Sequence, residues 1–296
     1  MCRSSWPGRS AAGWLLFGLT RGGIALLLAL TSYALFSYAL SRPIGVDVAA
    51  YWSAAERLRD GAPLYAAAEA NASELYRYAP WFAALWIPAT WLPRESVVAI
   101  WVAVMIGAAA LSTLPLLQRG PTGWAAFAIF APLQLQGAIF GNVQPLLVLA
   151  LMWGVGRRSG PLWIAIGASL KAAPLVLALV YAGRGEWRRA GLATALTAAL
   201  VAPMFLFDLS AYSTSPGPNQ QSLAAVSPFL FVPVAFASAV AAFALARTRY
   251  GWLAGALAIV ACLPRLLTYQ AGFLLVGLSS KRPSANLPDD SADRES

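Results

Sequence analysis

Long apolar runs alternate with short polar segments along this chain of 296 residues. An apolar run of about 20 residues is long enough to cross a bilayer as a helix. Runs near that length occupy residues 23–40, 97–117, 124–140, 191–207 and 228–246. The pattern predicts an all-α polytopic membrane protein, and with the shorter apolar runs included we expect about nine to eleven membrane segments.

Other apolar runs are short or interrupted. Residues 81–91 contain Pro88 and are too short to cross comfortably, so a tilted span and a re-entrant segment both remain open. Residues 143–156 form a shorter run, and residues 251–278 are interrupted by Pro264 and Arg265. The prediction is therefore a helical bundle that includes broken or re-entrant helices.

The run 161–182 has arginines on both sides, at 157–158 and at 184–189. Since basic loops stay in the cytoplasm, both ends of this run should lie on one side of the membrane. We expect two half-helices that break near Lys171 and Pro174, which places Lys171 at membrane depth. A lysine there is a candidate functional group, and a lysine that reaches the membrane surface or bridges two helices is the alternative.

Two polar segments are predicted to lie outside the cell, at residues 42–78 and 208–227. The first belongs to the longest interval without an apolar run and contains five of the twelve carboxylates. The second has no Lys or Arg. Residues 48–59 have the spacing of a short interfacial helix, which Gly61 should end. Trp52, Trp81 and two further tryptophans at 86 and 91 are expected to be anchors at the membrane surface.

Basic residues cluster between the apolar runs and account for the formal charge of +9. This distribution marks cytoplasmic loops, so we attribute the charge to topology and expect no nucleic-acid partner. Three arginines and no acid precede residue 23, so the N-terminus should be cytoplasmic; a cleaved signal peptide is the alternative to a retained anchor. We expect a multi-pass protein of the cell membrane, with one integral domain at 1–278 and a disordered cytoplasmic tail at 279–296.

Composition restricts the chemistry. Hydrophobic residues make up 59% of the chain and charged residues 11%, far from the values of soluble domains. There is no histidine, and the two cysteines lie far apart, so the sequence predicts no bound metal and no cofactor. Acid–base chemistry would have to use carboxylates, lysine, tyrosine or water.

Polar residues on the expected outer side or at membrane depth come from distant parts of the chain but could converge on one face. They are Asp47, Tyr51, Tyr65, Arg77, Tyr78, Asn142, Gln144, Lys171, Asn219, Gln220 and Ser222. A carboxylate beside cations suggests a base facing an anionic leaving group. For Asp47 the structural alternative is a surface carboxylate that caps the helix after it.

Five short elements, in the expected order, resemble glycosyltransferase family 87, the membrane mannosyltransferases of the C-type superfamily. They are Gly45-Val46-Asp47 with Tyr51, Leu58, Gly61 and Pro63-Leu64-Tyr65; Tyr76-Arg77-Tyr78-Ala79-Pro80; Gly141-Asn142 with Gln144; Lys171 with Pro174; and the Asn219–Leu223 loop. Where many relatives have an aromatic residue followed by histidine, this chain has the segment 266–270, which reads LLTYQ.

The resemblance implies a C-type glycosyltransferase bundle whose site takes a sugar, most commonly mannose, from a polyprenyl-phosphate donor to a lipid or glycan acceptor. Asp47 would be the base of a single inverting displacement, and Lys171 and Arg77 would hold the departing phosphate. Asn219 and Gln220 would contact the sugar or the acceptor. Membrane lipids surround the whole domain.

A transporter or lipid flippase is the competing class of protein, because broken helices and a lysine at membrane depth also occur there. A transporter should have internal symmetry, whereas this chain concentrates its polar residues in one early loop, which favours an enzyme. A shortened, non-catalytic member of the same fold is the third possibility.

Overall fold

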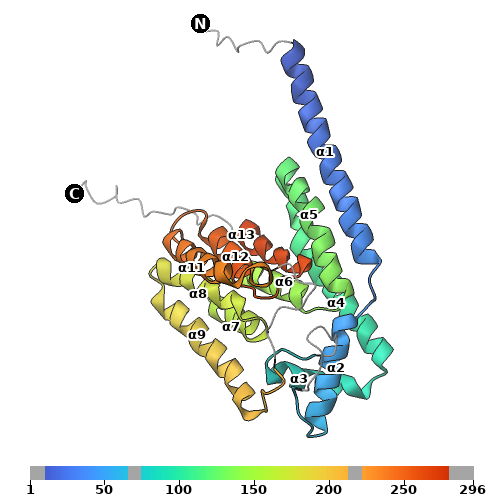
Figure 1. Ribbon diagram of the computed structural model, residues 1–296, viewed down its shortest axis with the longest axis vertical. Helices are drawn as coiled ribbons and strands as arrows, with labels where there is room; N and C mark the ends of the chain where they lie inside the picture. Colours follow the sequence, from blue (N-terminus) through green and yellow to red (C-terminus); the bar gives the residue numbers. More distant parts are fainter. Residues whose placement is uncertain (1–10, 66–74, 213–221, 280–296) are drawn as a thin grey trace, which may run out of the picture.

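The computed structural model describes residues 11–65, 75–212 and 222–279, and the regular structure within these ranges is helical throughout. The expected all-α architecture is therefore confirmed for the described part of the chain. In Figure 1 the long α1 (Ala11–Leu40) and the neighbouring α5 (Gly120–Ile139) stand beside a packed group that contains α6 to α13. The helices α2 (Val46–Arg59) and α3 (Pro80–Trp86) lie together at one end of the molecule.

Apolar side chains of α1 are exposed along most of the part from Gly22 to Leu40. Ile24, Leu26, Leu27 and Leu30 are each more than half exposed, and the contacts of α1 are mainly with α5. Exposed apolar surface of this extent is stable only in an apolar surrounding, which a bilayer supplies. Among the described residues, three stretches are long and apolar enough to cross a membrane, namely Gly22–Leu40, Arg94–Ile139 and Trp187–Leu206.

The 46-residue stretch Arg94–Ile139 is a hairpin, because α4 (Arg94–Thr113) and α5 pack against each other. The short 3₁₀ helix η2 (Leu114–Arg119) joins them, with Pro115 in its first turn and Gly120 at φ 69° after it. Proline ends the α-helical hydrogen bonding, and glycine adopts positive φ without steric cost. Several further helices are apolar but shorter than a full span, so the figure of nine to eleven membrane segments stays a prediction.

The run 161–182 is interrupted where the sequence indicated. α7 (Gly160–Leu170) ends before Lys171, whose backbone is extended, and η3 (Ala173–Val176) then leads into α8 (Leu177–Gly183). Pro174 accounts for the interruption because it has no N–H to donate and clashes with a preceding helical turn. The remaining elements are α6 (Gln144–Gly154), α9 (Trp187–Val201), η4 (Ala202–Leu206), α10 (Leu223–Val226), α11 (Pro228–Ala244), α12 (Gly251–Ala261), η5 (Thr268–Phe273) and α13 (Leu274–Ser279).

The first polar segment contributes to the core, which the sequence did not indicate. Residues 48–52, 54 and 55 of α2 are buried, and none of residues 46–58 is exposed. α2 packs against α3 and the 3₁₀ helix η1 (Ile87–Trp91). Trp52 and Trp86, expected to be surface anchors, are also buried, whereas Trp91 is 74% exposed. Alanines on several faces of α2 explain the burial, because they let neighbouring helices approach closely.

Candidate functional site

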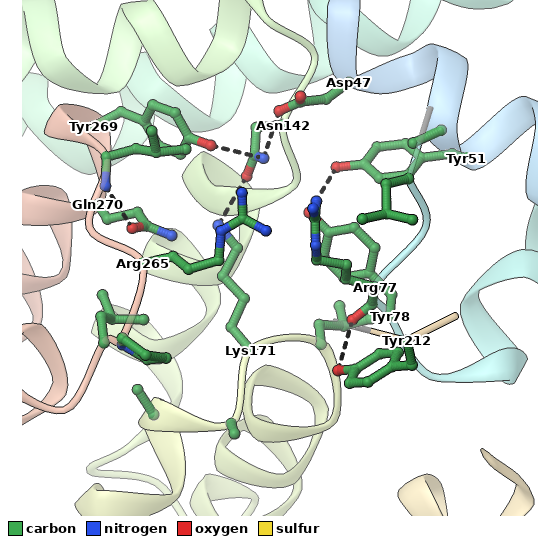
Figure 2. A pocket seen from close by; sticks show the side chains of 18 of the residues that line it. Asp47, Tyr51, Arg77, Tyr78, Asn142, Lys171, Tyr212, Arg265, Tyr269 and Gln270 are labelled. Atoms are coloured by element: carbon green, nitrogen blue, oxygen red, sulfur yellow. Dashed lines mark hydrogen bonds between the residues drawn. The ribbon is translucent and has the colours of Figure 1, made fainter. Parts of the chain in front are cut away.

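A cavity of about 460 Å³ lies where six separate parts of the chain meet. They are the start of α2, the segment before α3, the turn between α5 and α6, the break after α7, the segment after η4, and the stretch from the end of α12 into η5. Figure 2 shows side chains from these parts pointing toward one another. The polar residues of the lining are Asp47, Tyr51, Arg77, Tyr78, Asn142, Lys171, Tyr212, Arg265, Tyr269 and Gln270.

Backbone hydrogen bonds dock the first turn of α2 on the end of α5. The N–H groups of Gly45 and Asp47 donate to the carbonyl oxygens of Ile139 and Phe140, at 2.8 and 2.9 Å. The free carbonyls at the end of one helix thereby satisfy free N–H groups at the start of another. This contact brings Asp47 next to the turn that carries Asn142, although 95 residues separate them in sequence.

Gly141 shapes that turn. Its φ is 70°, and a Cβ atom at this position would lie 2.5 Å from Cγ2 of Val48. The Gly141 carbonyl accepts a hydrogen bond from Nε1 of Trp101, and the N–H of Asn142 donates to the carbonyl of Gly137. Glycine is therefore required both for the backbone conformation and for the close approach of α2.

Asn142 connects the acid of the cavity to its lysine. Its Nδ2 donates to Oδ2 of Asp47 at 2.6 Å and to Oη of Tyr269 at 3.1 Å. Its Oδ1 accepts from Nζ of Lys171 at 3.1 Å and from the N–H of Gln144 at 2.9 Å. Both amide hydrogens and both oxygen lone pairs are thus used, so Asn142 holds the charged groups rather than offering free contacts to a ligand.

Lys171 points into the cavity and bridges the break after α7 to the start of α6, which agrees with the expected alternative of a lysine that links two helices. Its Nζ also donates to Oε1 of Gln144 at 2.9 Å, and it lies 5.3 Å from the ring centroid of Tyr269, within cation–π range. The helix break after Leu170 makes this position possible, because the extended backbone at Lys171 turns the side chain away from the axis of α7. The ammonium group of Lys171 is thus held by the neutral side-chain oxygens of Asn142 and Gln144 at the edge of the cavity.

Burial raises the pKa of the Asp47 carboxyl above its ordinary value, while the hydrogen bond from Asn142 and the charges of Lys171 and Arg77 act in the opposite direction. A raised pKa makes the carboxylate a stronger base. The Asp47 side chain does not cap α2: the residue before the helix is Gly45, and that cap has no side-chain hydrogen bond. The capping alternative is therefore not supported.

Cations outnumber acids in the lining, since Arg77, Lys171 and Arg265 accompany the single carboxylate of Asp47. Burial, together with the charge of Arg265, lowers the pKa of Arg77 to about 10. Because Arg77 remains charged near neutral pH, the cavity carries a net positive charge there. Such a cavity favours an anionic ligand.

Tyrosines form the wall on the α2 side. Tyr51 is fully buried; its hydroxyl donates to that of Tyr78 at 3.3 Å and accepts from the N–H of Val143 at the same distance. Tyr65 lies behind this wall, where its hydroxyl donates to the carbonyl of Tyr78 at 2.9 Å. Tyr51 and Tyr78 line the cavity, whereas Tyr65 supports them from outside it.

Three expected site residues do not line the cavity. They are Tyr65, Gln144 and Ser222. Gln144 is fully buried behind Lys171. The hydroxyl of Ser222 donates to the carbonyl of Pro264 and caps α10 by accepting from the N–H of Ala225. Ser222 therefore holds the segment after α12 in place. Asn219 and Gln220 lie outside the described residues.

Four of the polar lining residues named above were not among the expected site residues: Tyr212, Arg265, Tyr269 and Gln270. Three of them lie where the apolar run 251–278 is interrupted. The pair Pro264-Arg265 could have indicated a site there, because a charge and a helix breaker inside an apolar run often mark one. Tyr212 carries no such sequence signal; its hydroxyl donates to the carbonyl of Arg77 at 3.4 Å.

Within the described ranges, no group of three or more His, Cys, Asp or Glu side chains is placed so that it could hold a metal ion. No family model matches the chain, and neither a curated protein nor a solved structure matches it. The resemblance to family 87 therefore stays a prediction, and the cavity is the feature on which a function can be based.

Proposed function

We propose that the cavity is the active site of a membrane hexosyltransferase. It would move a hexose, mannose by the resemblance to family 87, from a polyprenyl-phosphate donor to a hydroxyl of a lipid or glycan acceptor. The observation that carries this proposal is the chain of hydrogen bonds from Asp47 through Asn142 to Lys171, in a cavity that also holds two arginines. The proposed base and a proposed phosphate-binding cation are therefore both hydrogen-bonded to the same side chain, that of Asn142.

The proposed step is a single inverting displacement. The acceptor oxygen attacks the anomeric carbon of the sugar, and its proton passes to the carboxylate of Asp47. The bond between the anomeric carbon and the phosphate oxygen breaks, and the polyprenyl phosphate leaves with the electron pair. Lys171 and Arg77 stabilise the negative charge that develops on that phosphate, and Arg265 adds a third cation. In such a displacement the base and the cations act on opposite sides of the reacting carbon, so the sugar would have to lie between Asp47 and the cations that hold the phosphate.

The position of the basic turns supports an extracytoplasmic site. Arg189 donates to the carbonyls of Val155 and Arg157, and Arg247 donates to that of Gly183, so the turns after α6, α8 and α11 lie together. The cavity is at the other end of α7, a helix of 11 residues, which corresponds to about 16 Å. Because arginine-rich turns stay in the cytoplasm, the cavity would open on the opposite side of the cell membrane.

The direct test is Asp47→Asn, with Asp60→Asn as the matched control. Asp60 follows the last residue of the same helix, is exposed and pairs with Arg59, outside the cavity. Purified protein in lipid nanodiscs would receive radiolabelled polyprenyl-phosphate-mannose and candidate lipid or glycan acceptors. We expect Asp47→Asn to lower transfer by about 10²-fold or more, since general-base assistance is lost, and Asp60→Asn to retain wild-type transfer.

Two outcomes contradict the proposal. Equal transfer by wild type and Asp47→Asn would remove Asp47 from the mechanism. If the wild type transferred sugar from none of the lipid-linked donors tested, the enzyme assignment would fail, and the transporter or non-catalytic alternatives would be favoured.

A further inference from the structure

A second cavity, of about 500 Å³, lies beside the first, between α3, η1, α4, α6 and α7. Each of its lining residues is Ala, Val, Leu, Ile, Phe or Trp. The indole N–H groups of three of its four tryptophans are directed elsewhere: Nε1 of Trp81 donates to Ser169, that of Trp101 to the Gly141 carbonyl and that of Trp163 to Ser159. We call this cavity the apolar groove. Its chemistry fits a hydrocarbon chain and offers nothing to a sugar.

The apolar groove opens toward the side of the bundle. On its rim Leu85, Leu92 and Ile100 are exposed by 67, 53 and 61%. Ile100 belongs to α4, which is part of the stretch Arg94–Ile139 that is apolar and long enough to cross a membrane. In a bilayer this rim would face lipid, so a hydrocarbon chain could enter the groove without passing through water.

The apolar groove and the polar cavity share a wall. Leu170 lines both, and it directly precedes Lys171, whose ammonium group points into the polar cavity. On the other side of the groove Val143 directly follows Asn142. The two cavities are therefore adjacent at Leu170, and a molecule with an anionic head at Lys171 and an apolar chain in the groove would have to pass that side chain.

We propose that the apolar groove binds the isoprenoid units of the donor next to its phosphate, and so contributes to recognition of the donor chain. This inference rests on the proposed function. The chain of the donor, rather than that of an acceptor lipid, is the occupant because the junction lies at the cation that would hold the leaving phosphate. Ala150 and Ala89 are the small residues in the part of the groove formed by α6 and η1, and they determine how much chain it accepts.

The test fills the apolar groove and compares donors of different length. Ala150→Trp and, as a milder second variant, Ala89→Leu project into the groove, whereas Ala103→Trp makes the matched change at an exposed position of α4 outside it. Each variant would be assayed with a long polyprenyl-phosphate sugar and with the same sugar on a phosphate bearing one isoprene unit. Transfer from the short donor also serves to verify that the variant is folded.

We expect Ala150→Trp to lower kcat/KM for the long donor by about tenfold or more, the order of discrimination that an apolar pocket provides. The short donor should change by less than about twofold, and Ala103→Trp should change neither. Equal loss with both donors in the milder variant Ala89→Leu, no loss with either donor, or a loss that follows the acceptor's chain length would overturn the inference.

A binding measurement separates this inference from the proposed function. Retention of polyprenyl phosphate without sugar, measured by native mass spectrometry, requires no transfer. Retention that Ala150→Trp weakens would support the groove even in a protein that transfers no sugar. Sugar transfer together with retention that the variant leaves unchanged would overturn the groove and leave the proposed function standing.

Discussion

The stability of the site should depend on the hydrogen bonds of Asn142, and one pair of substitutions tests this. Asn142→Leu removes a buried amide that makes four hydrogen bonds, two of them to the charged groups of Asp47 and Lys171. Gln134→Leu removes a buried amide of α5 for which the described residues provide no hydrogen-bond partner at either atom. Both changes replace a buried amide by leucine. The main difference between them is that the amide of Asn142 is hydrogen-bonded and that of Gln134, within the described part of the chain, is not.

The expected magnitudes follow from that difference. A hydrogen bond to a charged group contributes about 1.5–3 kcal/mol, so the loss of two should lower the free energy of unfolding by about 3 kcal/mol or more. For a domain of this size each kcal/mol corresponds to a change of about 2–4 °C in the unfolding temperature. We therefore expect Asn142→Leu to unfold about 6–12 °C below wild type. Gln134→Leu should unfold at the wild-type temperature or above it, since burying an unpaired amide is itself unfavourable.

Intrinsic tryptophan fluorescence during heating would give the unfolding temperatures, because the chain has 12 tryptophans and needs no label. Both variants and the wild type would be measured in the same detergent and in the same lipid nanodiscs. A similar decrease for the two variants would mean that side-chain volume, rather than hydrogen bonding, sets the effect. An unchanged unfolding temperature for Asn142→Leu would refute the idea that Asn142 holds the site together.

Two further predictions concern pH and backbone conformation. Because the folded protein raises the pKa of Asp47 above the ordinary value of 3.8, transfer that needs the ionised carboxylate should decline, as pH falls, at a higher pH than an unperturbed aspartate would give. A profile of kcat/KM against pH whose acid midpoint lies at or below about 4 would contradict this. Gly141→Ala should unfold at a lower temperature than Gly61→Ala: both glycines have φ near 70°, but only at Gly141 would the new Cβ clash, 2.5 Å from a methyl group of Val48. Equal unfolding temperatures of the two alanine variants would show that the close contact is unimportant.

The sequence by itself determined the class of the protein and much of its local structure. Apolar runs of span length are sufficient to indicate membrane helices, because hydrophobicity summed over some 20 residues does not depend on tertiary contacts. The break after Leu170 could be located for the same reason, since Pro174 and Lys171 disfavour a continuous apolar helix whatever surrounds them. Asp47, Asn142 and Lys171 could be selected because polar groups at or near membrane depth are costly.

The tertiary structure alone decided which of these groups meet. Asp47 and Asn142 are within 2.6 Å because the start of α2 binds the end of α5, and no local pattern specifies that contact. The same packing buries Trp86 in the wall of the apolar groove and brings Tyr269 to Asn142 from the other end of the chain. Burial and hydrogen-bond partners depend on the helices that pack together, whereas hydropathy and helix breaking depend on neighbours in sequence. That difference is the physical reason why the helices could be predicted and the arrangement of the site could not.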